Sequence, residues 1–344
     1  MPNLLFLDSC GDHLGSSDTT LKPLSGVNIS TSGRTGSCYD LSSAGAQVWL
    51  TKALRNPTSG ATNNTLTVGC AYKVMTLAYP GVMIQMNNAW TNAKATLYHL
   101  EDGRMYFVAT YGAYSVTSAT SASVLTVGNW YYIEFSSTMA VGETAWVYTG
   151  TLKCNGETLV TATGALSGVP AESGWSYFGI GSGPFHGGNA YCDDVYVTDG
   201  EFLGDIRLYV IRPNAVGDEN QWSITGSATA WGATKDTTPD YATTIIYTPT
   251  TGHSTTVNLE DLGAIGPIKG LQANYVTTKD QAGDASFSPR YKISGSMYDS
   301  SRVFYPSWQS WIDFTEAFRK NPITGNDWQV AEVNAMQQGL KRIS

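Results

Sequence analysis

The sequence predicts an all-β protein built from two sandwich-like units, and three observations lead to this prediction. Charged residues make up only 14% of the chain, while 36 glycines and 13 prolines supply the turns that many short strands need. Tyrosine, valine and threonine recur throughout, and these side chains suit the half-buried faces of strands. Apolar runs return about every eight to twelve residues without a helical period between them, which is typical of sandwiches and barrels.

The strands of the first unit are predicted from alternation and from turn residues. The run 65–74 (TLTVGCAYKV) places every second residue on one apolar face. A Glu-Asp-Gly turn at 101–103 and an Asn-Gly pair at 155–156 each separate two apolar runs, which indicates hairpins because these residues tolerate positive φ. The aromatic run 128–137 is expected to form a core strand, and 190–198 to close the unit.

A second unit is expected to begin near Gly200, so that the chain divides into residues 1–200 and residues 201–344. The run 205–213 (DIRLYVIRP) alternates and predicts the first strand of this unit, whereas the glycine- and threonine-rich segment 226–245 predicts a long loop. Further strands are predicted in TTIIYTP, TTVNLEDL, IKGLQANYVTTKD and FSPRYKISGSMYDS.

The C-terminal segment is predicted to form a helix that packs against the sheet. Asn326 or Asp327 can cap its first turn, and Gly339 can end it. Lys341 and Arg342 would then lie at the negative end of the helix dipole, which is a favourable place for cations. The apolar stripe of this helix would consist of Val330, Val333 and Leu340.

Charge excludes several classes of partner. The net charge is −8 and no run of lysine or arginine occurs, so we expect neither nucleic-acid binding nor adsorption to an anionic membrane. The start, MPNLLFLDSCGDHLG, lacks the regions of a signal peptide, and no stretch approaches the ~20 apolar residues of a membrane span. We therefore expect a soluble protein that is made in a cytoplasm.

No residue pattern of a catalytic or cofactor site occurs in the sequence. The four histidines are scattered, and the motifs HExxH, GxSxG and GxxxxGK[ST] are absent. The glycine-rich run 179–188 has the wrong spacing for a dinucleotide loop. Five cysteines occur without a CxxC pair or a zinc spacing, and we expect them to be buried. We therefore assign no catalytic residue, cofactor or metal ligand, and we predict no enzymatic activity.

Three aspartates near the end of the first unit could form an acidic site. Glycosidases need two carboxylates that flank the scissile bond, and the E-x-D-x-x-E pattern of sandwich-type glucanases is absent. Asp193 and Asp194 are adjacent, so a regular strand would point them to opposite faces. Asp194 could bind calcium together with Asp12 or Asp199. Our prediction is that these carboxylates are instead solvated at turns and at a sheet edge.

The stretch YPSWQSWIDF (305–314) concentrates aromatic residues without clean alternation, which is typical of a packing or interface edge. We expect a protein interface here, formed by Phe304, Tyr305, Trp308 and Trp311. Because charge is sparse, affinity would come from apolar contact, and we expect a symmetric homo-oligomer. Aromatic side chains can also stack on sugars, so glycan binding stays open as an alternative.

Several of these segments together resemble the concanavalin A-like, laminin-G-type jelly roll of tailed-bacteriophage structural proteins. In the first unit the likeness is carried by LLFLDSCGDH, GRTGSCYDL, TLTVGCAYKV, GNWYYIEF, the Asn155-Gly156 hairpin and YCDDVYVTDG. FLGDIRLYVIRPN resembles the next segment of the phage proteins. NPITGNDWQVAEVNAMQQGLK resembles their C-terminal Asn-Pro-x-Thr-Gly-x-x-Trp segment and helix. The resemblance extends over nearly the whole chain.

The resemblance implies a concanavalin A-like jelly roll over residues 1–200. Residues 201–344 would form a smaller β-sandwich with a C-terminal helix, and this second unit would attach the chain to its partner. The chain would be a virion component assembled in the host cytoplasm, binding the major capsid protein or tail proteins as a head decoration, head fibre or tail part. The alternative is a tail adhesin that binds a host glycan. The metal-ligand pattern of legume-type lectins is not matched, so their sugar site is not carried over.

Overall fold

The computed structural model describes residues 3–9, 22–23, 27–34, 36–42, 49–54, 64–88, 93–141, 146–167, 174–181, 189–235, 243–263, 265–280, 283–308 and 310–344. Two compact units are present: unit 1 extends to Leu208, and unit 2 runs from Tyr209 to Ser344. The division thus falls at Leu208, whereas the sequence placed it near Gly200. Among the described residues, no helix is long and apolar enough to cross a membrane.

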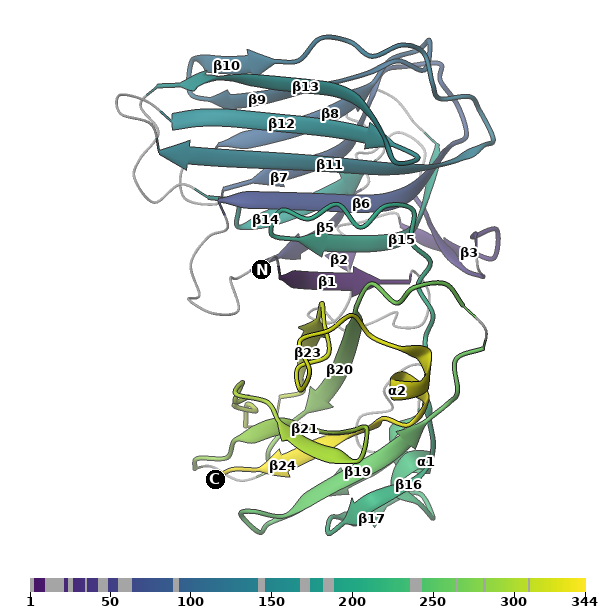
Figure 1. Ribbon diagram of the computed structural model, residues 1–344, viewed down its shortest axis with the longest axis vertical. Coiled ribbons are helices and arrows are strands. Elements are labelled where there is room, and N and C mark those ends of the chain that lie inside the picture. The colour runs from purple at the N-terminus through teal and green to yellow at the C-terminus, as the bar shows by residue number, and fades with distance from the viewer. Residues whose placement is uncertain are drawn as a thin grey trace. The chain divides into compact units, whose positions relative to one another are not determined.

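Unit 1 is a jelly-roll β-sandwich of two facing sheets (Figure 1). The first sheet has eight strands, in the order β13 (Glu157–Leu166), β12 (Trp146–Cys154), β11 (Trp130–Val141), β6 (Thr65–Val74), β15 (Ala190–Thr198), β4 (Cys38–Asp40) and β3 (Asn28–Ser30), with β1 (Leu4–Asp8) also paired to β15. The second has seven strands, in the order β10 (Tyr114–Thr117), β9 (Met105–Tyr111), β8 (Lys94–His99), β7 (Gly81–Asn87), β14 (Tyr177–Gly181), β5 (Trp49–Ala53) and β2 (Lys22–Pro23). The predicted jelly roll is therefore confirmed.

The core of unit 1 lies between these two sheets. Phe107 of β9 and Phe135 of β11 meet across it with ring centroids 5.2 Å apart. The alternating apolar residues of β6 face this core, as the sequence predicted. The Asn-Gly pair at 155–156 forms the turn from β12 to β13, with φ of +49° and +84°. Local alternation and turn chemistry therefore placed these strands correctly.

Residues 201–208, which we call the strap, contain no helix or strand. The strand predicted over 205–213 is therefore wrong, and β16 begins only at Pro213. Leu203 and Ile206 of the strap are nevertheless buried. Several of its backbone N–H groups are bonded by side chains of the eight-stranded sheet rather than by a neighbouring strand. The apolar alternation that suggested a strand thus belongs to an irregular segment fixed to unit 1.

Unit 2 is a smaller β-sandwich, again as predicted. Its larger sheet has five strands, in the order β16 (Pro213–Asn220), β19 (Ser254–Leu259), β24 (Gln337–Arg342), β21 (Phe287–Ile293) and β22 (Ser296–Asp299). Two-stranded sheets are formed by β20 (Leu271–Thr277) with β23 (Ile312–Phe318) and by β17 (Ser223–Thr225) with β18 (Ile245–Tyr247), and α1 (Ala230–Thr234) interrupts the predicted loop.

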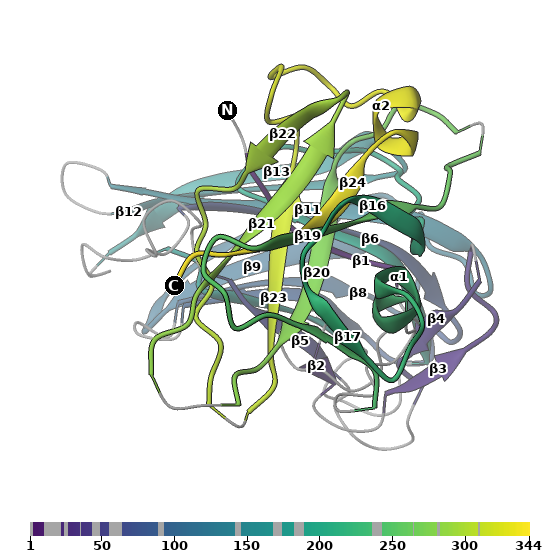
Figure 2. The ribbon, with the colours of Figure 1, turned by 90° about the horizontal axis from the view of Figure 1, so that it is seen from below.

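The core of unit 2 lies between the five-stranded sheet and the β20–β23 pair, which Figure 2 shows behind that sheet. Tyr291 of β21 packs edge-on against Phe318 of β23, with ring centroids 5.1 Å apart. Trp328 closes the core and is buried. Aromatic packing therefore joins the two layers of unit 2.

The predicted C-terminal helix is much shorter than expected. It is α2 (Val330–Asn334), begun by a capping box of Gln329 and Glu332, and β24 follows it almost at once. Gly339 does not end a helix but lies in the centre of the sheet, where a Cβ would come within 1.8 Å of the Thr255 carbonyl oxygen. The segment after α2 pairs with both β19 and β21, so long-range pairing overrides its helical pattern.

Val333 is fully buried in the core of unit 2, so Val333→Asp should destabilise this unit. An unpaired carboxylate in an apolar contact should lower its free energy of unfolding by about 3 kcal/mol. Thermal unfolding would show a lower transition for unit 2 and an unchanged transition for unit 1. The control is Ile323→Asp, because Ile323 is 43% exposed. An equal fall in both transitions would mean that the units do not unfold independently.

Candidate functional site

Asp193 and Asp194 are both fully buried, so the prediction that they are solvated is wrong. A bulge interrupts the pairing of β15 with β6 between Asp193 and Tyr196, and Asp194 has a φ of +49°. The bulge breaks the alternation of the strand. As a result both carboxylates reach Arg34: Asp193 accepts its backbone N–H at 2.8 Å, and Asp194 Oδ2 lies 3.7 Å from its Nη1.

Arg34 is the shared cation of this acidic cluster. Its side chain is only 8% exposed, and its guanidinium lies 5.5 Å from the centre of the Tyr132 ring. Its Nη2 donates to both oxygens of Asp205 in the strap, at 2.8 and 3.0 Å. A guanidinium presents several donors in a fixed plane, which suits this arrangement of carboxylates. Arg34 therefore links β15, β11 and the strap.

A third buried carboxylate, that of Glu134 on β11, also holds the strap. Tyr196 donates its hydroxyl proton to Glu134 and accepts the Leu203 N–H at 3.0 Å. Glu134 Oε1 also accepts the Gly204 N–H at 2.8 Å. The ring of Tyr196 lies directly over Gly69 of β6, where a Cβ would come within 2.0 Å of a ring carbon. These groups lie on the outer face of the eight-stranded sheet, beneath the strap.

This cluster serves as a structural lock, because its carboxylates already bond to groups of the chain itself. Asp199, the third predicted aspartate, accepts the backbone and side-chain N–H groups of Asn3, at 2.5 and 2.8 Å. Within the described ranges, no group of three His, Cys, Asp or Glu side chains could hold a metal ion. Asp12, the other proposed calcium ligand, lies outside the described residues, as do Cys10 and 182–188. The other four cysteines are buried, namely Cys38, Cys70, Cys154 and Cys192.

The outer face of the seven-stranded sheet carries the half-buried side chains of Gln85, Tyr98 and Tyr106, together with Asn87 and Thr96, which are buried. Tyr98 and Tyr106 stand opposite each other on β8 and β9, with their rings stacked 5.1 Å apart. Beside them, Gln85 donates to Thr96 at 3.1 Å, and Asn87 donates to Gln85 at 3.1 Å. These residues alternate with core residues, so their side chains point away from the sandwich interior. Groups of this kind bind neutral polar ligands.

The predicted aromatic interface is only partly exposed. Tyr305 is 70% exposed, Trp308 52% and Trp311 37%. Phe304 is buried instead: its ring stacks on Phe314 at 4.3 Å, and its backbone pairs with β21. Phe304 therefore belongs to the core of unit 2, and the prediction that it forms part of an exposed surface is wrong. The other three aromatic side chains lie at the surface of unit 2.

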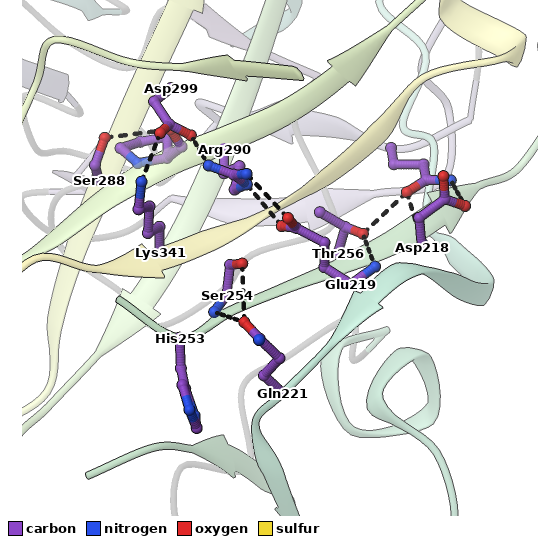
Figure 3. Close-up of polar contacts among 12 residues, drawn as sticks. Asp218, Glu219, Gln221, His253, Ser254, Thr256, Ser288, Arg290, Asp299 and Lys341 are labelled. Atoms are coloured by element: carbon purple, nitrogen blue, oxygen red, sulfur yellow. Dashed lines mark hydrogen bonds and ion pairs between the residues drawn. The ribbon is translucent and has the colours of Figure 1, made fainter. Parts of the chain in front are cut away.

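A network of paired charges covers the outer face of the five-stranded sheet in unit 2 (Figure 3). Arg290 of β21 donates to both oxygens of Glu219 on β16, at 2.6 and 2.9 Å. It also pairs with Asp299, which Lys341 reaches at 3.0 Å. These bonds tie the edge strand β16 to β21 across two intervening strands. Because the charges neutralise one another, this face carries no excess charge for steering a ligand.

Comparisons with known proteins give likenesses of structure alone. No protein-family model matches the chain, and no curated protein matches it. A carbohydrate-binding module of Bacillus subtilis is 9% identical, covers 53% of this chain and 98% of its own length, and gives a TM-score of 0.32. The carbohydrate-binding module of a Ruminococcus gnavus sialidase, bound to sialyllactose, is 16% identical, with coverages of 40% and 76% and a TM-score of 0.28.

A protein of unknown function from Shewanella oneidensis is 14% identical, covers 60% of this chain and 91% of its own length, and gives a TM-score of 0.37. At such low similarity these proteins do not assign a ligand to the chain. The β-sandwich fold itself follows from the strand order and register of unit 1. Any function has to be argued from the surfaces and contacts of this chain.

Tyr196→Phe tests the structural lock. The substitution removes the hydroxyl that bridges Glu134 and the Leu203 N–H, and it leaves both groups buried without that partner. Unit 1 should lose about 2 kcal/mol of unfolding free energy, measured by urea denaturation. Tyr114→Phe is the control, because Tyr114 is 50% exposed. Equal stability of the two variants would contradict the role given to Tyr196.

Proposed function

We propose that this chain is a non-catalytic structural component of the surface of a tailed-phage virion. It is a head decoration, a head fibre or a part of the tail, and it binds other virion proteins. The observation that supports this proposal is that the side chains of the chain's most distinctive motifs bond to other groups of the chain itself. Carboxylates that would be free to act on a substrate in an enzyme here accept hydrogen bonds that stabilise the fold.

The motif YCDDVYVTDG, at the end of the first unit, bonds to the chain in this way. Asp193 and Asp194 bond the backbone of Arg34 and of Leu208, and Gly204 donates to Glu134. Each of these bonds fixes a segment of the chain and leaves no carboxylate pair beside an open cleft. Such a motif supports a mechanical role and not hydrolysis, which needs two accessible carboxylates.

The Asn-Pro-x-Thr-Gly-x-x-Trp motif is used in the same way. Asn321 is buried and accepts the backbone N–H groups of Ile323 and Thr324, at 2.9 and 3.3 Å. It donates to Glu332 of α2 at 3.0 Å, while Trp328 fills the core. The motif thus builds the turn before α2. Both motifs that carry the phage resemblance therefore support a structural protein.

Attachment is assigned to unit 2 through Tyr305, Trp308 and Trp311. Three exposed aromatic side chains within a few residues supply apolar area of the kind that forms the centre of protein interfaces. The partner is the major capsid protein or a tail protein, and the chain binds as a symmetric homo-oligomer. Since the contact is apolar, it should resist high salt.

Phage carrying Trp308→Ala together with Trp311→Ala should assemble particles that lack this chain, while the purified variant stays folded. The double substitution removes the exposed apolar contact but touches little of the core. Particle composition is measured by quantitative mass spectrometry after washing in about 1 M salt. Tyr247→Ala removes an equally exposed ring elsewhere in unit 2 and is the control. Normal copy number in the double variant, or loss of the wild-type chain in salt, would refute this interface.

A second candidate function, adhesion to a host glycan, is favoured by the outer face of the seven-stranded sheet. Tyr98 and Tyr106 offer half-buried ring surface and Gln85 offers an amide group, while Asn87 and Thr96 are buried and orient Gln85 by hydrogen bonds. Sugars combine apolar C–H faces with hydroxyl groups and need both kinds of contact. A tail position would bring this face to the host surface.

A glycan array tests the adhesin function. Wild-type protein should bind a set of neutral glycans, and Tyr98→Ala with Tyr106→Ala should lose at least about tenfold in affinity. Tyr79→Ala is the control, since Tyr79 is 48% exposed and lies outside the sheet. Absence of binding by the wild type would exclude this candidate and leave the structural role intact.

A further inference from the structure

The strap is held to unit 1 by an unusual set of bonds for an irregular segment. The N–H groups of Leu203, Gly204 and Leu208 are accepted by Tyr196, Glu134 and Asp194, at 3.0, 2.8 and 2.9 Å. Asp205 is bonded to Arg34 from the other side. The strap is also the segment that leads directly into unit 2 at Tyr209. Whatever fixes the strap therefore fixes the point at which the chain leaves unit 1.

Charge is unevenly balanced beneath the strap. The Arg34 guanidinium lies against the carboxylates of Asp194 and Asp205, and Asp205 also pairs with Arg207 at 2.7 Å. The third carboxylate, Asp193, accepts the backbone N–H of Arg34. Asp194 Oδ2 and Arg34 Nη1 are buried, 3.7 Å apart, and neither has a hydrogen-bond partner. Two adjacent carboxylates with no access to solvent are costly to keep ionised together.

Asp194 is the group that titrates near neutrality. Burial first, and then the charge of Asp193, raise its pKa from the ordinary 3.8 to about 7, with Asp205 adding to the rise. The Leu208 N–H and the Arg34 charge act in the opposite direction. Tyr132 of β11 also faces it, donating its hydroxyl proton to the Asp194 carbonyl, and Glu134 lies nearby on the same strand.

The raised pKa of Asp194 determines how closure of the strap depends on pH. A closed strap holds a proton on Asp194 that an open, solvated Asp194 would release between pH 3.8 and about 7. Closure is therefore most stable below the ordinary pKa of 3.8. It weakens as the pH rises toward 7, and it becomes independent of pH above that value.

We propose that the strap is a latch on unit 1 whose opening is driven by the loss of a proton from Asp194. Once released and fully extended, residues 201–208 would span about 26–29 Å from end to end. Acidic conditions keep the strap closed on unit 1, and neutral conditions allow it to open. This proposal does not depend on the virion assignment, because it concerns contacts within one chain.

Hydrogen exchange of the full-length chain, followed by mass spectrometry, tests the latch. After correction for the intrinsic effect of pH, exchange of the amides at 203, 204 and 208 should rise by more than about tenfold between pH 5 and pH 7.5 and then level off. Amides in the paired strands β6 and β11 should not follow this change. Unchanged protection of the strap across this range would overturn the proposal.

Two variants separate the effect of Asp194 ionisation from the effect of the contact between Arg34 and Asp205. Asp194→Asn retains an acceptor for Leu208 but cannot ionise, so the exchange of its strap should lose the dependence on pH. Asp205→Asn weakens the hold of Arg34, so its strap should exchange faster at every pH and keep the wild-type slope. A slope that persists in Asp194→Asn would overturn the proposal. If Asp194→Asn fails to fold, a missing slope in Asp205→Asn would overturn it instead.

Discussion

The burial of Arg34 among carboxylates is the constraint on which the architecture of unit 1 depends. A guanidinium removed from water needs both charge partners and hydrogen bonds, and here these come from β15 and from the strap. Removing one partner would leave a buried charge uncompensated, which costs far more than the pair contributes. Asp194 at the bulge and Asp205 in the strap both lie against this cation.

In both units, buried or paired polar side chains hold neighbouring segments of the chain in place. In unit 1 the buried carboxylates fix an irregular segment, and in unit 2 Arg290 fixes the edge strand β16 through Glu219. Bonds of this kind restrain segments that ordinary strand pairing would leave loose. What remains for partners is the surface that these networks leave unused, chiefly exposed aromatic and amide groups.

Strands and turns that depend on adjacent residues could be predicted from the sequence, whereas contacts between residues far apart in the chain could not. The strand 65–74 and the Asn155-Gly156 turn were predicted correctly because alternation and positive φ are properties of adjacent residues. Arg34 meets Asp193 across a separation of 159 positions, and no local pattern marks that contact. Asp193 and Asp194 were expected at the surface because a bulge cannot be read from alternation. Glu134, a charge inside an otherwise apolar run, was the one available signal of a buried network.

The position of β24 sets the order in which unit 2 can be completed during synthesis. This strand lies between β19 and β21, although the chain makes β19 and β21 long before residues 337–342 emerge from the ribosome. Until then both neighbours present unpaired backbone edges to the solvent, and such edges invite pairing with other chains. Unit 1 has the same arrangement, because β15, which is completed only at Thr198, lies between β6 and β4. Nascent chains therefore expose such edges in each unit until its late central strand has emerged, and slower translation would prolong that exposure.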